Sequence, residues 1–153
     1  MSIEIAKVDP SSSEVARILT IHHNFCVDTT CIENVYALEA SKLVSPDITV
    51  FGAYKNGELV GVGAIRMLDS THGELKSMHT LASARGQGIG RAMVNHIIDF
   101  ALSKGARRLS LETGSNDAFK PARELYISLG FKSCDAFGDY KLSEDNICMT
   151  KLL

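Results

Sequence analysis

The chain lacks the patterns that mark membrane, secreted and nucleic-acid-binding proteins. No apolar run approaches the roughly 18 residues that a membrane-spanning helix needs, and the N-terminus has no apolar signal-peptide core. The formal net charge of the 153 residues is only −2, so the sequence has no overall basic character. We therefore expect a soluble cytoplasmic protein that binds neither membranes nor nucleic acid.

Motifs of metal sites and hydrolases are also absent. Neither G-x-S-x-G nor H-E-x-x-H occurs, and no cysteine belongs to a C-x-x-C pair or has a histidine at zinc-finger spacing. We therefore expect no metal, and reduced structural thiols at Cys26, Cys31, Cys134 and Cys148. Four histidines show no spacing typical of a metal site or a catalytic triad: His22, His23, His72 and His96.

The length and the apolar periodicity predict one domain built on a mixed sheet. A chain of 153 residues can bury about 70% of the surface of its unfolded form, so we expect a single domain over residues 1–153. Strand patterns precede, separate and follow helical ones, which favours an α/β (α+β) fold with helices on both faces of the sheet. The expected strands are 3–8, 48–55, 58–68, 74–81, 108–113, 131–134 and 147–152, and the expected helices are 13–22, 33–44, 91–104 and 117–129.

The most informative segment is the glycine-rich loop Arg85-Gly86-Gln87-Gly88-Ile89-Gly90, between an expected strand and a long amphipathic helix. Closely spaced glycines let the backbone turn its N–H groups toward an anion, and the helix adds the positive end of its dipole. The loop lacks the Gly-Lys-Ser/Thr ending of a P-loop, since Arg91-Ala92 follow Gly90. It also lacks the third glycine of a dinucleotide fingerprint. It therefore predicts a pyrophosphate cradle of another kind.

The remaining pattern, Arg/Gln-x-x-Gly-x-Gly/Ala, is matched by Arg85, Gly88 and Gly90. It resembles the acyl-CoA signature of the GNAT superfamily of N-acetyltransferases. A second segment, residues 122–131, resembles the family's Ala-x-x-Leu-Tyr-x-x-x-Gly-Phe element. The resemblance extends from about Ile48 to the C-terminus, whereas the first 47 residues match no motif.

The resemblance implies the GNAT fold, a mixed and mostly antiparallel sheet of about seven strands with about four flanking helices. Strands 4 and 5 are splayed in this family, and the pantetheine arm of acetyl-CoA adds its amides to the edge of strand 4. The matching edge here is Met78-His79-Thr80, and the opposite lip is 111–113. His79 alternates in direction with its two neighbours, so we expect its side chain to face another surface and to have no catalytic role.

The resemblance also implies acetyl-CoA as the acyl donor. The residues expected to bind it are Met78, His79, Thr80, Arg85, Gly86, Gln87, Gly88, Ile89, Gly90, Arg91, Asn116 and Tyr126. Three of them have an ordinary alternative. Arg85 and Arg91 are also what an exposed helix start commonly carries, and Asn116 is equally suited to a turn or a helix cap.

Acyl transfer to an amine needs a base, because the amine is mostly protonated near neutral pH. Glu74 is the first candidate, since it lies four residues before Met78, as a strand-borne glutamate does in members of the family. Glu112, in the facing strand, is the second. Tyr126 matches the family tyrosine that protonates the leaving thiolate, although its place in an i, i+3, i+4 apolar stripe also suits the core.

The acceptor is least determined by the sequence. In this family residues matching 11–47 and 137–146 shape its site. Five acidic residues against two basic ones in 11–47 would favour a cationic amine, although a solvated helix face explains the same excess. Tyr140 and Glu144-Asp145 are candidates to line its other side. We expect a small-molecule amine, with a protein lysine or N-terminal amine as the alternative. A non-catalytic acyl-CoA-binding module is the alternative of another class, and the resemblance also allows a homodimer.

Overall fold

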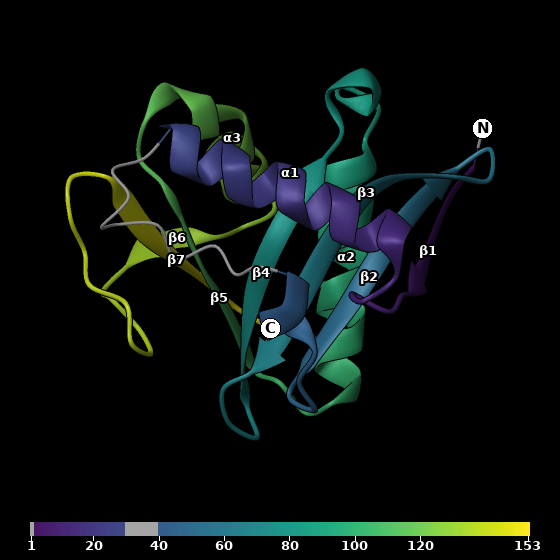
Figure 1. The fold of residues 1–153 in the computed structure, drawn as a ribbon. Coiled ribbons are helices and arrows are strands. Elements are labelled where there is room, and N and C mark those ends of the chain that lie inside the picture. The colour runs from purple at the N-terminus through teal and green to yellow at the C-terminus, as the bar shows by residue number, and fades with distance from the viewer. Residues whose placement is uncertain (1, 30–39) are drawn as a thin grey trace.

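The computed structural model describes residues 2–29 and 40–153, which form a seven-stranded mixed sheet (Figure 1). The strands are β1 (Ile3–Lys7), β2 (Ile48–Lys55), β3 (Glu58–Met67), β4 (His72–Thr80), β5 (Arg108–Gly114), β6 (Lys132–Cys134) and β7 (Asn146–Leu152). Their order is β1-β2-β3-β4-β5-β7-β6, and every neighbouring pair is antiparallel except β4 and β5. The expected mixed and mostly antiparallel sheet is confirmed.

Within the described residues, three α-helices accompany the sheet: α1 (Ser13–Thr29), α2 (Ile89–Ser103) and α3 (Lys120–Ser128). Short 3-10 turns are η2 (Ala40–Leu43), η3 (Ala82–Ala84) and η4 (Asp117–Phe119). Helix α1 continues past its expected end at His22. The helix expected over 33–44 falls mostly outside the described residues. The helix expected over 117–129 divides into η4 and α3, with Pro121 in the first turn of α3, where its missing N–H costs nothing.

The helices cover both faces of the sheet and bury a core on each (Figure 1). The face under α1, which we call the α1 face, packs Val15, Ile18 and Leu19 against β2 and β3. The other face packs the apolar stripe of α2 against the sheet, together with residues of α3. The expected amphipathic helix is present, and its buried residues include Met93, Val94, Ile97 and Ala101, whereas Leu102 at the end of the same apolar pattern is 49% exposed.

Strands β4 and β5 separate halfway along their length. Their ladder pairs residues 72–75 with 108–111 and then stops, so the second half of β4 has a free edge on that side. The β3–β4 register shifts between Val62, opposite His79, and Ala64, opposite Lys76, which leaves β4 with one extra residue. Ser77 in this β-bulge has φ 54°. The expected splay is therefore present.

The bulge reverses which face the later side chains of β4 occupy. Glu74 and Lys76 lie on the α1 face, and so does His79, whose partner Val62 belongs to the α1-side core. Met78 lies on the opposite face, where its sulfur approaches Gly63 beside Met93. His79 thus faces away from Met78, as expected. A regular strand would have placed Glu74 and Met78 on the same face.

Candidate active site

The glycine-rich loop has the backbone of an anion cradle. Gly86 and Gly88 have φ 77° and 82°, in the left-handed region that favours glycine, and Gly88 is the N-cap of α2. No atom outside the adjacent residues lies within 4 Å of the position that a Cβ would take at either glycine. At Gly90 a Cβ would lie 3.0 Å from the Leu125 side chain, so this glycine lets α2 approach α3. Main-chain N–H groups at the start of α2 are consequently open to a phosphate.

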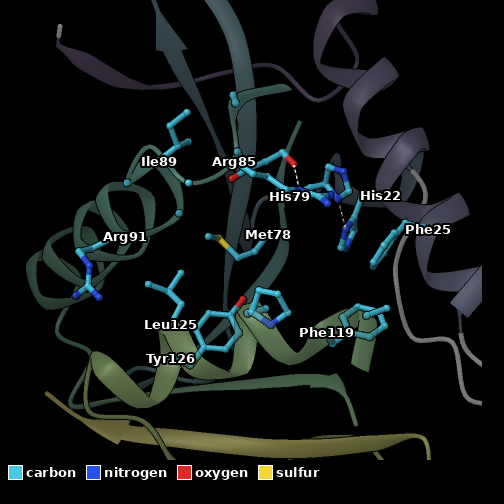
Figure 2. Close-up of a pocket in the computed structure, with 18 residues that line it drawn as sticks. His22, Phe25, Met78, His79, Arg85, Ile89, Arg91, Phe119, Leu125 and Tyr126 are labelled. Carbon is cyan, nitrogen blue, oxygen red and sulfur yellow. Dashed lines mark hydrogen bonds between the residues drawn. The ribbon is translucent and has the colours of Figure 1, made fainter. Parts of the chain in front are cut away.

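A pocket of about 410 Å³ extends from this loop between α1, β4, α2 and α3 (Figure 2). All the residues predicted to bind acyl-CoA line it except Gln87 and Asn116. The Gln87 side chain accepts a hydrogen bond from Lys55, and Asn116 Oδ1 accepts one from the Ala118 N–H at 3.0 Å. Asn116 therefore serves as the cap of η4, and its contact with pantetheine stays a prediction.

Other pocket residues carried no signal of their own in the sequence. His22 and Phe25 come from α1, which matched no motif, and Phe119 comes from η4. The Phe25 and Phe119 rings meet edge to face with centroids 5.2 Å apart. Ala122 and Leu125 also line the pocket and belong to the second motif, so their position could have been inferred from it. The α1 side of the pocket is thus the part that sequence reasoning missed.

Tyr126 belongs both to the core and to the pocket wall. Its ring is 5% exposed and packs against Phe131 in the core. Its hydroxyl points into the pocket toward Met78 (Figure 2), and none of the hydrogen bonds among the described residues involves it. Burial raises the pKa of this phenol well above its usual range, so it stays protonated and its O–H can donate a hydrogen bond.

The two arginines beside the loop are anchored at the pocket wall. Arg91 Nη2 donates to Ser128 Oγ at 2.8 Å, which ties α2 to α3. Arg85 Nε donates to the Thr80 carbonyl at 3.2 Å, and its guanidinium lies 6.0 Å from the Phe25 ring centroid. Both side chains line the pocket, where they add positive charge near the loop.

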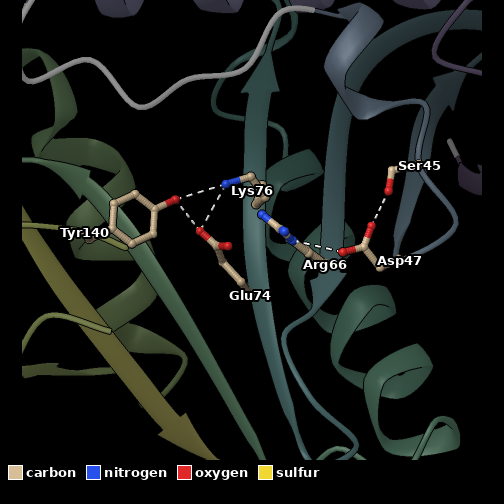
Figure 3. A network of polar contacts seen from close by, with 6 residues as sticks. All are labelled: Ser45, Asp47, Arg66, Glu74, Lys76 and Tyr140. Carbon is tan, nitrogen blue, oxygen red and sulfur yellow. Dashed lines mark hydrogen bonds and ion pairs between the residues drawn. The ribbon is translucent and has the colours of Figure 1, made fainter. Parts of the chain in front are cut away.

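A buried polar cluster, which we call the Glu74 cluster, lies on the α1 face and consists of Glu74, Lys76 and Tyr140 (Figure 3). The Glu74 side chain is 3% exposed, and its Oε2 accepts from Lys76 Nζ at 3.0 Å and from the Tyr140 hydroxyl. Lys76 Nζ also donates to that hydroxyl at 2.9 Å. Burial and the Glu74 charge raise the pKa of Tyr140, which keeps it a donor. Tyr140 lies between β6 and β7, so the cluster ties this segment to β4 across the splay.

Glu112 projects from β5 on the same face of the sheet. Its Oε2 accepts from Asn146 Nδ2 at 3.0 Å. Burial raises the pKa of the Glu112 carboxyl, the Asn146 hydrogen bond and the Lys76 charge lower it, and the Glu74 charge raises it. Glu74, Lys76 and Glu112 together carry one more negative than positive charge when ionised. The arrangement therefore favours a cation, and Glu112 is the carboxylate without an ion-pair partner among the described residues.

His22 and His79 contact each other although 56 residues of the chain lie between them. Their Nδ1 atoms are 3.1 Å apart, and His22 Nε2 lies 3.8 Å from the Cys26 sulfur. Burial lowers the pKa of His22 to about 3 and that of His79 to about 4, so both imidazoles are neutral near pH 7. No spacing in the sequence indicates this pair, because α1 brings His22 over β4 only in the folded chain.

The described part of the chain contains no group of three or more histidine, cysteine, aspartate or glutamate side chains placed to hold a metal ion. Nor does it contain a helix that is long and apolar enough to span a membrane. Cys26, Cys134 and Cys148 are free thiols.

Comparisons with known proteins agree with this geometry. The pattern of the Acetyltransferase (GNAT) family matches residues 15–131. The uncharacterized N-acetyltransferase YsnE of Bacillus subtilis strain 168 is 41% identical over 145 residues, which cover 95% of this chain and 96% of that protein. The IAA acetyltransferase of Azospirillum brasilense is 32% identical over 153 residues, with 99% of each chain covered. A GNAT family acetyltransferase from Elizabethkingia anophelis, solved with acetyl-CoA bound, shares the fold with a TM-score of 0.74 at 18% identity, over 99% of this chain and 98% of that chain.

Proposed function

Because this chain belongs to the acetyltransferase (GNAT) family and is an acetyl-CoA-dependent N-acetyltransferase, we propose that its acceptor is the primary amine of a small molecule. We also propose that residues 1–153 form one domain, since β1 near the N-terminus and β7 near the C-terminus belong to the same sheet. The main observation that supports an acyltransferase site is the pocket, which joins the anion cradle to the open edge of β4.

The residues around the pocket suit acyl-CoA. Loop N–H groups at Gly86 and Gly88 would hold the pyrophosphate, with Arg85 and Arg91 adding charge. The free edge of β4 at residues 78–80 offers its backbone to the pantetheine amides, and an N–H there would stabilise the developing oxyanion. Acetyl-CoA supplies the activated thioester. The Tyr126 hydroxyl would give its proton to the departing thiolate sulfur.

We propose Glu112 as the group that takes the proton from the acceptor ammonium before attack. Lys76 and Tyr140 already occupy one oxygen of Glu74, whereas Glu112 forms no ion pair with the described residues and has a raised pKa, with burial as the main cause. Glu74 would then bind the cation electrostatically and hold Tyr140 in place. That Glu74 itself is the base stays a prediction, and the pH profiles of Glu74→Gln and Glu112→Gln distinguish the two carboxylates.

The enclosed charges favour a small acceptor. Lys76 and Glu74 have side-chain exposures of 8% and 3%, and Tyr140 lies over them, so a narrow ligand fits this face better than a segment of folded protein. Two similar proteins, the IAA acetyltransferase and the streptothricin acetyltransferase of Streptomyces lavendulae, are named for small molecules, whereas a third, RimI of Mycobacterium tuberculosis, is named as an N-alpha-acetyltransferase.

A thiol-release assay with acetyl-CoA and a panel of small amines, aminoglycosides and peptides tests the proposal. We expect turnover on members of the small-amine panel and none on peptides. Turnover on peptides alone would show a protein acetyltransferase, and acetyl-CoA binding without turnover on any acceptor would favour a regulatory module. Acetyl-CoA should also raise the melting temperature, because it binds the folded state. An unchanged melting temperature at millimolar acetyl-CoA would overturn the assignment of the pocket.

A further inference from the structure

Three side chains, Cys26, His22 and His79, form a series of contacts from α1 to the wall of the pocket. Cys26 Sγ lies 3.8 Å from His22 Nε2. His22 Nδ1 lies 3.1 Å from His79 Nδ1, a contact that Figure 2 shows. His22 and His79 both line the pocket. No described residue forms a hydrogen bond with His79 Nε2, the last nitrogen in this series of contacts.

Only one proton can lie between the two Nδ1 atoms. At 3.1 Å one nitrogen donates and the other accepts, so the two neutral rings must be in opposite tautomers. If His22 carries the Nδ1 proton, its Nε2 is an acceptor and His79 carries its own proton on Nε2. In the reverse arrangement His22 carries its proton on Nε2, and His79 has a bare Nε2 lone pair.

The Cys26 thiol selects between these arrangements. An imidazole nitrogen is a better acceptor than sulfur, and a thiol hydrogen is more acidic than a neutral imidazole N–H, so S–H to Nε2 is the favoured direction. Burial raises the pKa of Cys26 to about 11, which keeps the hydrogen on sulfur. With His22 Nε2 as the acceptor, His22 carries its proton on Nδ1 and donates it to His79 Nδ1. His79 therefore carries its own proton on Nε2.

We propose that His79 offers its Nε2–H to a carbonyl oxygen of the bound acyl donor, and that Cys26 and His22 are positioning residues that fix this tautomer. The inference rests on the proposal that the pocket holds acyl-CoA, whose thioester and pantetheine amides supply the carbonyl oxygens. The charged and titratable groups near these three side chains are Arg85 near His79, His23 near His22 and Glu112 near Cys26. The nearby Arg85 charge opposes protonation of His79 and so maintains a neutral N–H donor.

Nitrogen-15 NMR of the histidine rings tests the tautomers directly in the full-length protein. We expect His22 to carry its proton on Nδ1 and His79 on Nε2 before any ligand is added, and acetyl-CoA to shift the His79 Nε2–H signal. Cys26→Ala should mix the tautomers, whereas Cys26→Ser, which keeps a donor, should restore them. A proton on Nδ1 of His79 in the unliganded protein would overturn the proposal.

Two substitutions of His79 separate hydrogen bonding from packing. Glutamine can place an amide N–H near the former Nε2, whereas asparagine reaches only as far as Nδ1. We expect His79→Asn to lower kcat/KM for acetyl-CoA about tenfold and His79→Gln to retain most of it, with both variants folded by circular dichroism. Equal losses in the two variants would contradict the proposed donor.

Comparison of kcat with acetyl-CoA affinity in the His79 variants identifies which carbonyl oxygen accepts the hydrogen bond. A fall in kcat with unchanged acetyl-CoA affinity assigns the thioester oxygen, whereas weaker binding of both CoA and acetyl-CoA assigns a pantetheine amide. If acetyl-CoA raises the melting temperature but leaves the His79 Nε2–H signal unmoved, this inference fails and the proposed function stands. If acetyl-CoA does not bind at all, the proposed function fails and this inference with it.

Discussion

The two sides of the splay between β4 and β5 differ in the chemical groups that they present. On the proposed donor side, which comprises the loop 85–90, the β4 edge at 78–80 and Tyr126, backbone groups and apolar side chains form most of the wall. On the proposed acceptor side, the Glu74 cluster and Glu112 place ionisable groups on the α1 face. The pyrophosphate and pantetheine of acyl-CoA are the same in every reaction of the family, so main chain suffices to bind them. The acceptor varies, and its recognition depends on side chains.

This difference predicts different responses to pH and mutation. Backbone N–H groups do not titrate, so acetyl-CoA binding should depend little on the acceptor-side carboxylates. Catalysis should depend on them strongly. Substitutions on each side of the splay test that separation.

The largest effect is expected at Glu112. Glu112→Gln should lower kcat/KM for the acceptor amine by about a hundredfold, because a proton acceptor is lost, and should leave the acetyl-CoA Kd unchanged. In the wild type kcat/KM should fall as the pH drops through the raised Glu112 pKa, and this acidic limb should disappear in the variant. Steady-state kinetics and calorimetric titration measure both. If Glu74→Gln removes the limb and Glu112→Gln does not, Glu74 is the base. The exposed Glu124→Gln is the control.

Stability provides a second test of Glu112. Because its pKa is raised by folding, the ionised carboxylate weakens the folded state above that pKa, and the penalty disappears as the pH falls through it. Glu112→Gln should therefore raise the melting temperature at pH 7, and the gain should shrink at lower pH. A lower melting temperature at pH 7 would mean that the Asn146 hydrogen bond outweighs the buried charge.

The next largest effect is expected in the loop. Gly88→Leu should weaken acetyl-CoA binding at least tenfold, or by about 1.4 kcal/mol, since the side chain occupies the space open to the phosphate. Gly57→Leu is a matched control, because Gly57 has nearly the same φ, 80°, and is equally uncrowded, but lies in the β2–β3 turn. Both variants should lose similar stability by thermal melting. Equal acetyl-CoA affinity in the two would contradict the phosphate cradle.

Tyr126→Phe should have a smaller effect. We expect kcat to fall about tenfold through loss of the acid, with the acetyl-CoA Kd nearly unchanged because the ring still fills the core. Any alkaline limb of the kcat profile should persist in the variant, since the Tyr126 pKa is raised beyond the working range. Full turnover in the variant would exclude the proton-donor role.

The smallest effect is expected at Tyr140. Tyr140→Phe removes hydrogen bonds to Glu74 and Lys76 and should cost about 1–2 kcal/mol of unfolding free energy. The KM for the acceptor should rise a few-fold, with acetyl-CoA affinity unchanged. Urea denaturation and kinetics measure the two effects. The control is Tyr54→Phe, which removes a hydroxyl that forms no hydrogen bond with the described residues. A change in acetyl-CoA affinity in Tyr140→Phe would show that the two sides are coupled.

Much of the fold followed from local patterns. The Asn56-Gly57 turn places β2 and β3 where expected, and both residues have the positive φ that this turn requires. Gly105 and Gly130, with φ 90° and 95°, lie just beyond α2 and α3 as predicted. The bulge at Ser77 could not be predicted, because no glycine marks it and only the register with β3 reveals it.

The sequence by itself predicted the loop 85–90 and the start of α2, because these residues are contiguous and their backbone conformation is set by nearby glycines. Only the tertiary structure decided how the residues of the proposed acceptor side meet. Glu74, Glu112 and Tyr140 come from three separate segments, and His22 reaches His79 only because α1 packs across β4. Hydrogen bonds, burial and pKa shifts of side chains depend on neighbours distant in the chain, which local patterns do not encode.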